Sequence, residues 1–467
     1  MQVLNEINVS DVINRSPIGR FQWGLYFLCG LCLIMDGFDV QAIGYVAPAL
    51  SQDWKITGAI LGTVLTAALI GVLFGSILLS MLADKLGRRP VLLGATLFFS
   101  IATLVTAFVQ TVPELIAIRF VAGVALGSIM PNAMALVGEF SPHRARVPLM
   151  VVVAVGFNVG ATLGGVVSFW LIPHYGWRSI FYFGGAVPLV IGGLMAFLLP
   201  ESPQFLALHG KSPGKLGHLL QRVDSFLAIT PNTRFIVREH RETGLPMVKL
   251  FQEGRATRTV LLWTVYFMNL LNLYFLSSWL PTVTTPLIKA AGVSGSYALL
   301  VGTTLQLGGA TGVALGWFAA RLGFGPVLTT CFIVGSGAIA LIGQPHLSLR
   351  MLFGVVFVAG LGIVGAQSVI NALAATLYPT DLRSTGIGAG LGIGRIGSIV
   401  GPQLAGVLVG LHWSVHQLFL AAAVPALLSA VAMVLMHFSM NPSAPAASAK
   451  SSFVSKVRPR LHSDVTE

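Results

Sequence analysis

The chain is a succession of long apolar stretches separated by short polar loops. These stretches fall near 22–48, 58–82, 91–110, 114–138, 148–170 and 179–199, and again near 259–284, 295–318, 326–343, 351–376, 385–408 and 416–438. A helix needs about 20 apolar residues to cross a bilayer. The pattern therefore predicts an all-α membrane protein with twelve transmembrane helices in two six-helix halves. The runs lack the alternation that a membrane β-barrel shows.

The polar stretches divide this chain into five parts. We expect a cytoplasmic N-terminal segment at 1–21, a first six-helix bundle at 22–199, a cytoplasmic linker at 200–258, a second bundle at 259–438 and a disordered cytoplasmic tail at 439–467. In such a two-half arrangement, substrate binds near the midplane, between the halves.

Composition excludes a soluble protein. Of the 467 residues, 55% are hydrophobic and 9% are charged, and the mean hydropathy is +0.83, whereas soluble domains are about 25% charged. The net charge of +12 therefore does not indicate nucleic-acid binding. Of the 28 lysines and arginines, 22 fall on the side of the two termini and 4 on the opposite side. This bias predicts that both termini are cytoplasmic.

Catalytic and metal-binding patterns are missing from the sequence. No cluster of metal-ligand residues and no Ser–His or Cys–His pair can be placed together, so we expect neither an enzyme nor a cofactor. Two Gly-x-Gly-x-x-Gly segments, at 360–365 and 392–397, lie inside apolar helices. That motif binds dinucleotides only after a strand and at the start of a helix.

Acidic residues are rare at membrane depth. Only Asp36 and Asp39 in the first predicted helix, and Glu139 at the end of the fourth, lie there. Such groups are costly and usually functional, and a carboxylate withdrawn from water can exchange protons near neutral pH. Asp36 and Asp39 are three apart and share a helix face. We predict that both couple transport to protons, with Arg119 tuning Asp39. The alternative is a purely structural ion pair with an arginine.

A second intramembrane arginine points to the substrate. Arg395 lies near the middle of the eleventh helix, and no acidic residue in the second half's membrane region can pair with it. A guanidinium suits a carboxylate, which argues for an anionic substrate. Polar and aromatic residues of neighbouring helices complete the predicted substrate site: Arg395, Asn269, Asn272, Tyr266, Gln367, Asn371 and Phe38. The alternative is that the amides join helices.

Several motifs resemble those of a known superfamily. Ser80-Met-Leu-Ala-Asp-Lys-Leu-Gly-Arg-Arg89, between the second and third predicted helices, resembles the signature loop of the major facilitator superfamily. There Asp84 can cap the positive end of a neighbouring helix, and Arg88 and Arg89 can face the anionic inner leaflet. Pro200-Glu-Ser-Pro203 and Arg119-Phe-Val-Ala-Gly123 are also similar to its patterns.

More narrowly, the chain resembles the aromatic acid:proton symporter family. The segments that carry this resemblance are Asp36-Gly-Phe-Asp39, Tyr378-Pro-Thr-Asp-Leu-Arg383 and Gly392-Ile-Gly-Arg395-Ile-Gly397. The resemblance implies proton-driven import of an aromatic carboxylate, of the benzoate, hydroxybenzoate or hydroxyphenylpropionate class, in a bacterial inner membrane. We expect the carrier to be a monomer. The predicted gating residues are Asp84, Arg88, Arg89, Glu139 and Arg144. The chain departs from the signature at Ser80, where Gly is usual, and at Ala320, where the second copy of the loop has Asp.

Other functions remain open at this point. A carrier of a non-aromatic organic acid would need the same charges but not the aromatic side chains. An exporter would have the same topology, and a membrane sensor would bind the ligand without accumulating it.

Overall fold

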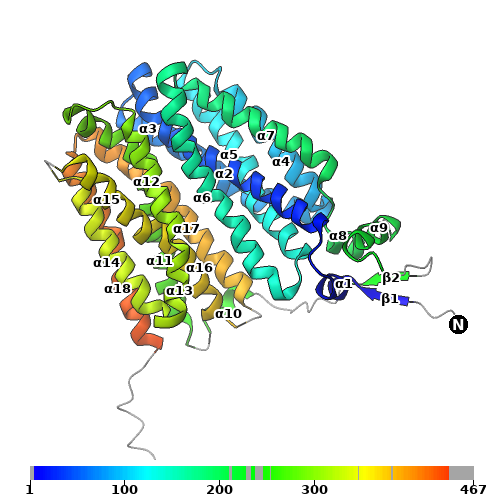
Figure 1. The fold of residues 1–467 in the computed structure, drawn as a ribbon. Helices are drawn as coiled ribbons and strands as arrows, with labels where there is room; N and C mark the ends of the chain where they lie inside the picture. Colours follow the sequence, from blue (N-terminus) through cyan, green and yellow to red (C-terminus); the bar gives the residue numbers. More distant parts are fainter. Residues whose placement is uncertain are drawn as a thin grey trace, which may run out of the picture.

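The computed structural model describes residues 5–209, 213–227, 233–236, 246–252, 254–344, 347–379 and 382–440. It shows two bundles of long helices lying side by side (Figure 1). Eleven described helices are long and apolar enough to cross a membrane, and a bent pair makes a twelfth. The prediction of a twelve-helix, two-half membrane fold is confirmed.

The first bundle holds the six helices that precede the linker. They are α2 (Arg20–Trp54), α3 (Gly58–Leu86), α4 (Arg88–Thr106), α5 (Val112–Phe140), α6 (His143–Tyr175) and α7 (Arg178–Leu198). Most extend a few residues beyond the predicted apolar runs, because their terminal turns are polar. Glycines let these helices approach closely. A Cβ added at Gly160 of α6 would lie 1.7 Å from the carbonyl oxygen of Ile34 in α2.

The second bundle has two interrupted spans. Its helices are α11 (Ala256–Ala290), α12 (Tyr297–Thr311), α13 (Val313–Leu322), α14 (Phe324–Ile342), α15 (Leu349–Gly360), the π-helical turn η1 (Leu361–Gly365), α16 (Ala366–Leu377), α17 (Arg383–Gly410) and α18 (Val415–Met440). Helices α12 and α13 together form one predicted span, bent by 41°. Helices α15 and α16 form another, joined by η1.

The linker is more structured than the sequence predicts. It contains α8 (Pro203–His209), α9 (Pro213–Val223), β2 (Thr233–Ile236) and α10 (Pro246–Lys249). Strand β1 (Asn5–Asn8) pairs in parallel with β2, and α1 (Val9–Arg15) packs on α9 through Val9, Val12, Ile13, Leu216 and Leu220. This two-stranded sheet is an addition to the expected all-helical fold. The predicted disordered tail lies outside the described residues, apart from its first two positions.

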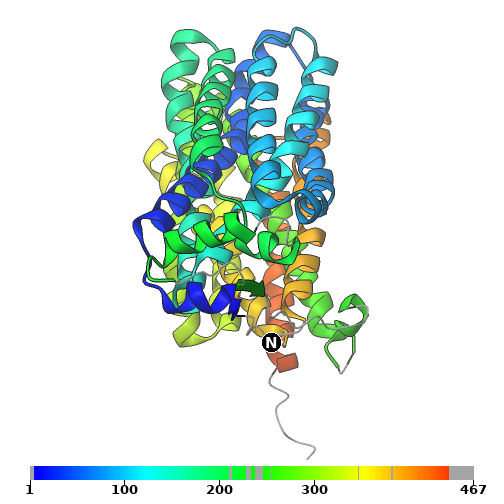
Figure 2. The same ribbon diagram turned by 90° about the vertical axis from the view of Figure 1, so that its right-hand side faces the viewer.

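The two ends of the molecule differ. We call the end that carries the N-terminus, α1, α8, α9 and the end of α18 the linker end (Figures 1 and 2), and the opposite end the far end. The bundles touch through α2 with α11, α3 with α17 and α6 with α12.

The named contacts between the bundles lie between the midplane and the far end. Gly44 packs on the backbone of Ser277, and the hydroxyl of Thr66 donates to Oε1 of Gln403 at 3.2 Å. Nearest the midplane is a cluster of apolar side chains from both bundles, which we call the central apolar cluster. Its members are Leu69, Leu270 and Tyr274, with Val40, Leu273 and Ile399 packed against them.

Candidate functional site

Asp39 and Arg119 form a fully buried ion pair inside the first bundle. Arg119 donates from Nη1 to Oδ1 at 3.2 Å, and from Nη2 to Oδ2 at 3.0 Å and to the Asp39 carbonyl oxygen at 3.2 Å. The hydroxyl of Thr103 donates to Oδ1 at 2.9 Å. Both charged side chains are 0% exposed. The predicted pairing of Asp39 with Arg119 is therefore present, and it joins α2, α4 and α5.

Asp36 lies differently, although it is only one turn away on α2. It is 5% exposed, and no hydrogen bond holds its carboxylate in the part of the chain described here. Its electrostatic neighbours are Arg395 of the second bundle and Asp39. Arg395 is partly exposed and donates to the hydroxyl oxygen of Tyr274 at 3.4 Å. The acidic neighbour that Arg395 lacks within its own half thus comes from the other half.

The central apolar cluster lies next to this pair of charges. Val40 follows Asp36 by four residues and Ile399 follows Arg395 by four, which is about one helical turn toward the far end. Tyr274 belongs to both groups, because its ring packs in the cluster and its hydroxyl accepts from Arg395. The charges therefore sit on the linker side of an apolar barrier made by both bundles.

Four of the predicted substrate residues form one hydrogen-bond network in the second bundle. Tyr266 donates to Oδ1 of Asn371 at 2.9 Å, and Gln367 donates to the same oxygen at 3.2 Å. Asn269 donates to Oε1 of Gln367 at 2.9 Å. Asn272 is 0% exposed, and neither polar atom of its amide has a partner among the described residues. Buried polar atoms without partners are costly, so this amide is a candidate ligand-binding group.

The π-helical turn η1 ends two residues before Gln367. A π turn makes i→i+5 hydrogen bonds and often marks a functional site. Here it adds a residue to the turn and so sets the face of the span on which Gln367 and Asn371 lie. The turn, Leu361–Gly365 with Gly360 as its N-cap, coincides with one of the dinucleotide-like motifs of the sequence. Its glycines were the signal for the irregular turn.

Phe38 is a correction to the predicted substrate site. Its ring is 1% exposed and lies 5.3 Å from the ring of Phe183, between Gly164 and Gly184 of the first bundle. The amide network belongs to the second bundle, so Phe38 does not line it. The sequence places Phe38 on the helix that carries the aspartates. Periodicity alone does not show whether its side chain faces the interior of the first bundle or the interface between the bundles.

Two of the predicted gating residues are bonded together at the linker end. Arg88 donates from Nε to Oε1 of Glu139 at 2.8 Å, and Ser202 donates to the other carboxylate oxygen of Glu139. Oε1 of Glu201 accepts from the backbone N–H groups of Arg88 at 2.9 Å and Arg89 at 3.1 Å. An acceptor there satisfies free N–H groups and complements the positive end of α4.

The contacts of Asp84, Arg89 and Arg144 differ from those expected. The Asp84 side chain is 73% exposed, reaches Arg88 only at 3.8 Å, and caps no helix among the described residues. Arg89 donates to the carbonyl oxygen of Ala196 in α7 at 2.6 Å. Arg144 donates to the carbonyl oxygens of Asn14 at 2.9 Å and Ser16 at 3.0 Å. Arg144 therefore holds the N-terminal segment and does not join the Glu139 group.

Sequence reasoning also missed contributors to these sites. Thr103 bonds to Asp39, Glu201 and Ser202 act at the linker end, and the guanidinium of Arg146 lies beside Gly138 and near Glu139. The Pro-Glu-Ser-Pro motif was the available signal for Glu201 and Ser202. Thr103 had none, because a threonine in an apolar helix usually bonds to its own backbone.

Known proteins resemble the chain over most of its length. The profile of the Major Facilitator Superfamily matches residues 29–402 and 262–463. The 4-hydroxybenzoate transporter PcaK of Pseudomonas putida is 37% identical over 432 residues, which are 92% of this chain and 95% of the relative. The chain belongs to the major facilitator superfamily, among its aromatic acid transporters. The family and its members are transporters, so the expectation that the chain is not an enzyme is confirmed.

Other relatives and solved structures agree with this assignment. The Gallate transporter of Pseudomonas putida is 37% identical, covering 92% of this chain and 94% of its own. The 3-(3-hydroxy-phenyl)propionate transporter of Escherichia coli K12 is 32% identical, covering 88% and 92%. The crystal structure of a D-xylose-proton symporter has a TM-score of 0.66 at 16% identity, with 89% and 97% covered. A bacterial homologue of the human lysosomal transporter Spinster, inward-facing and occupied, has a TM-score of 0.68 at 16% identity, with 91% and 98% covered. At this identity, the two structures support the fold alone.

Proposed function

We propose that this protein imports an aromatic carboxylate, together with a proton, across a bacterial inner membrane. The names of the relatives support the substrate class. The observation that carries the proposal is the placement of Asp36 and Arg395, which lie on different bundles, each about one helical turn from the central apolar cluster that both bundles form. A substrate carboxylate that engages Arg395 competes directly with Asp36.

The balance of charges at Asp36 and Arg395 couples substrate transport to proton transport. In the empty carrier, Asp36 and Arg395 neutralise each other. In the loaded carrier, the substrate carboxylate neutralises Arg395 and a proton neutralises Asp36. Substrate without a proton leaves one excess negative charge, and a proton without substrate leaves one excess positive charge. Since an uncompensated charge inside a membrane protein is costly, only the empty and fully loaded forms change conformation readily.

We assign the exchangeable proton to Asp36 and a positioning role to the Asp39–Arg119 pair. Asp36 has no hydrogen bond among the described residues and lies at the interface, whereas both oxygens of Asp39 are held by Arg119 and Thr103. The buried pair fixes α2 against α4 and α5, so that Asp36 stays opposite Arg395. One proton then enters with each monoanion, and the cycle moves no net charge.

The amide network is our candidate for recognising ring hydroxyl groups. An amide offers one acceptor and two donor hydrogens, which suits a phenolic hydroxyl. Asn272 has both its polar atoms free within the described residues, and Asn269 has a free Oδ1. A site with buried polar groups discriminates strongly against an analogue that cannot satisfy them. We therefore expect hydroxybenzoates to be preferred over benzoate.

Orientation follows from the basic residues. Most lysines and arginines lie on the side of the termini, so we place the linker end in the cytoplasm. The contacts beyond the central apolar cluster then close the outer side, and the binding residues are reached from inside. The domain boundaries, the cytoplasmic termini and a monomeric carrier belong to this proposal.

Uptake into proteoliposomes tests the proposal. We expect accumulation of labelled 4-hydroxybenzoate driven by an inward proton gradient, with no drive from a membrane potential alone. Asp36→Asn should lose gradient-driven accumulation but keep exchange of internal for external substrate. Asp11→Asn, which removes an exposed carboxylate of α1, is the matched control and should behave as the parent. Accumulation by Asp36→Asn, or equal uptake of aliphatic acids, would contradict the proposal.

A further inference from the structure

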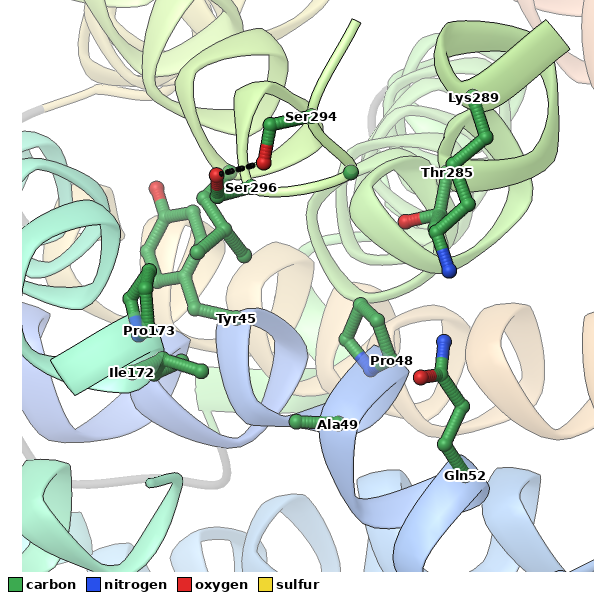
Figure 3. Close-up of a pocket in the computed structure, with 12 residues that line it drawn as sticks. Tyr45, Pro48, Ala49, Gln52, Ile172, Pro173, Thr285, Lys289, Ser294 and Ser296 are labelled. Carbon is green, nitrogen blue, oxygen red and sulfur yellow. Dashed lines mark hydrogen bonds between the residues drawn. The ribbon is translucent and has the colours of Figure 1, made fainter. Parts of the chain in front are cut away.

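A pocket opens at the far end, between the two bundles and away from the transport site. Its volume is about 250 Å³, and it is lined by residues of α2, α6, α11, α12 and the turn before α12. Drug-sized ligands occupy pockets of about 300–1,000 Å³, so this one suits a molecule with a single ring. Figure 3 shows the side chains of Lys289 and Gln52 turned toward each other across it.

The charge of the pocket favours an anion. Lys289 is its one charged lining residue, and no acidic residue lines it. Asp53, next to Gln52 in sequence, accepts a hydrogen bond from Nε1 of Trp177 at 3.0 Å instead. The turn before α12 also contributes, because Ser296 is the N-cap of that helix, and a helix N-terminus carries partial positive charge.

The walls of the pocket suit a flat ring. Pro48 and Pro173 present rigid apolar faces, and Tyr45 also lines the pocket, on the side of Pro173 (Figure 3). The Tyr45 hydroxyl is held by the carbonyl oxygen of Ala161 at 3.0 Å, so the ring is fixed in place. Gly295 leaves space for the lysine stem, since a Cβ there would lie 2.9 Å from Cε of Lys289.

We propose that this pocket is a second, external binding site for a small aromatic carboxylate, and that its occupant holds the far end closed. The carboxylate binds Lys289 and the ring lies against Pro48 and Pro173. Because the lining comes from both bundles, the pocket exists in this form only while the far-end contacts are made. A ligand that binds one conformation shifts the population toward it. External aromatic acid at high concentration therefore slows its own import.

The proposal relies on the proposed function only for the side of the membrane that the pocket faces. The ligand class follows from the pocket itself. A labelling experiment therefore tests it without any transport. The three cysteines of the protein, Cys29, Cys32 and Cys331, are buried, so a cysteine introduced at the exposed Ser294 is the main target of a membrane-impermeant maleimide.

Benzoate is the probe, and benzamide, which has the same ring without the charge, is its control. In Ser294→Cys, we expect millimolar external benzoate to slow labelling at least about threefold and benzamide to leave it unchanged. Adding Lys289→Gln should abolish the protection. Adding Arg350→Gln, which removes another exposed far-end cation outside the pocket, should preserve it. Protection that survives Lys289→Gln, or that benzamide also gives, would overturn the site.

Two further measurements separate this site from the transport site. Protection should persist in an Arg395→Leu background, because the pocket does not use Arg395; its loss there would assign the effect to the transport site. In the parent, the uptake rate should fall at high external substrate, and in Lys289→Gln it should rise to a plateau. A plateau in both proteins would overturn the closing effect. Complete absence of uptake would refute the proposed function. The labelling result would then still show whether the pocket binds an aromatic carboxylate.

Discussion

The buried pair of Asp39 and Arg119 allows a prediction with a defined magnitude. Arg119→Leu removes the guanidinium and its three hydrogen bonds to Asp39, leaving only the Thr103 hydroxyl on a carboxylate that is 0% exposed. Breaking a buried pair from one side costs about 3–5 kcal/mol. The ratio of folded to unfolded protein should therefore fall by about two to three and a half decades.

Removing both charges should be much less harmful. Replacement of a buried ion pair by uncharged groups of similar volume is often neutral, so Asp39→Asn combined with Arg119→Leu should recover most of the lost stability. Reversible unfolding in mixed micelles with increasing SDS, followed by the fluorescence of the eight tryptophans, measures both variants. A single variant within about 1 kcal/mol of the parent, or a double variant as unstable as the single one, would refute the reasoning.

The same double variant separates structure from proton coupling. If Asp36 carries the exchangeable proton, the double variant should still accumulate substrate when a proton gradient is applied, once its folded fraction is taken into account. If the double variant loses accumulation but still exchanges internal for external substrate, Asp39 rather than Asp36 carries the exchangeable proton.

Three shorter predictions test other contacts. Gly160→Ala should destabilise the first bundle strongly because the new Cβ meets the carbonyl oxygen of Ile34, whereas Gly193→Ala, with open space around it, should be neutral in thermal unfolding. Glu201→Ala removes the acceptor at the start of α4 and should cost about 0.5–2 kcal/mol in the same assay, as loss of a cap does. Tyr266→Phe removes one bond of the amide network. This variant should raise the KM for 4-hydroxybenzoate more than the KM for benzoate in competitive uptake. Equal changes in the two KM values would show that the network does not recognise the ring hydroxyl.

The transmembrane architecture was predictable because each span is identified by the apolar residues of its own segment. About 20 apolar residues suffice to identify a helix, and every predicted run overlaps the span expected of it, to within a few residues at either end. The parallel pairing of β1 with β2 was not predictable, since it joins two four-residue strands more than 200 residues apart. Short strands of that kind have no periodicity of their own.

The sequence predicted which residues belong to the sites better than it predicted which of them contact each other. Rare charges at membrane depth singled out Asp36, Asp39, Arg119 and Arg395, and an ion pair between Asp39 and an arginine was one of the alternatives. The approach of Asp36 to Arg395 depends on how two bundles dock, which no local pattern records. The same reason explains why Glu201, and not Asp84, caps a helix here: a cap depends on which helix end is nearby in a given conformation.

The pairing of the N-terminal segment with the linker has a consequence for how the chain is divided. Through β1 and β2, and through the packing of α1 on α9, the linker as far as Ile236 belongs with the first bundle, while α10 packs on α17. The covalent connection between the two units is therefore only the stretch 237–245, which spans at most about 33–36 Å between residues 236 and 246. A polypeptide break placed there would keep the described contacts within each unit intact. Two separately synthesised fragments divided at this stretch should then assemble into an active carrier. Fragments divided inside the α1–α9 unit should not.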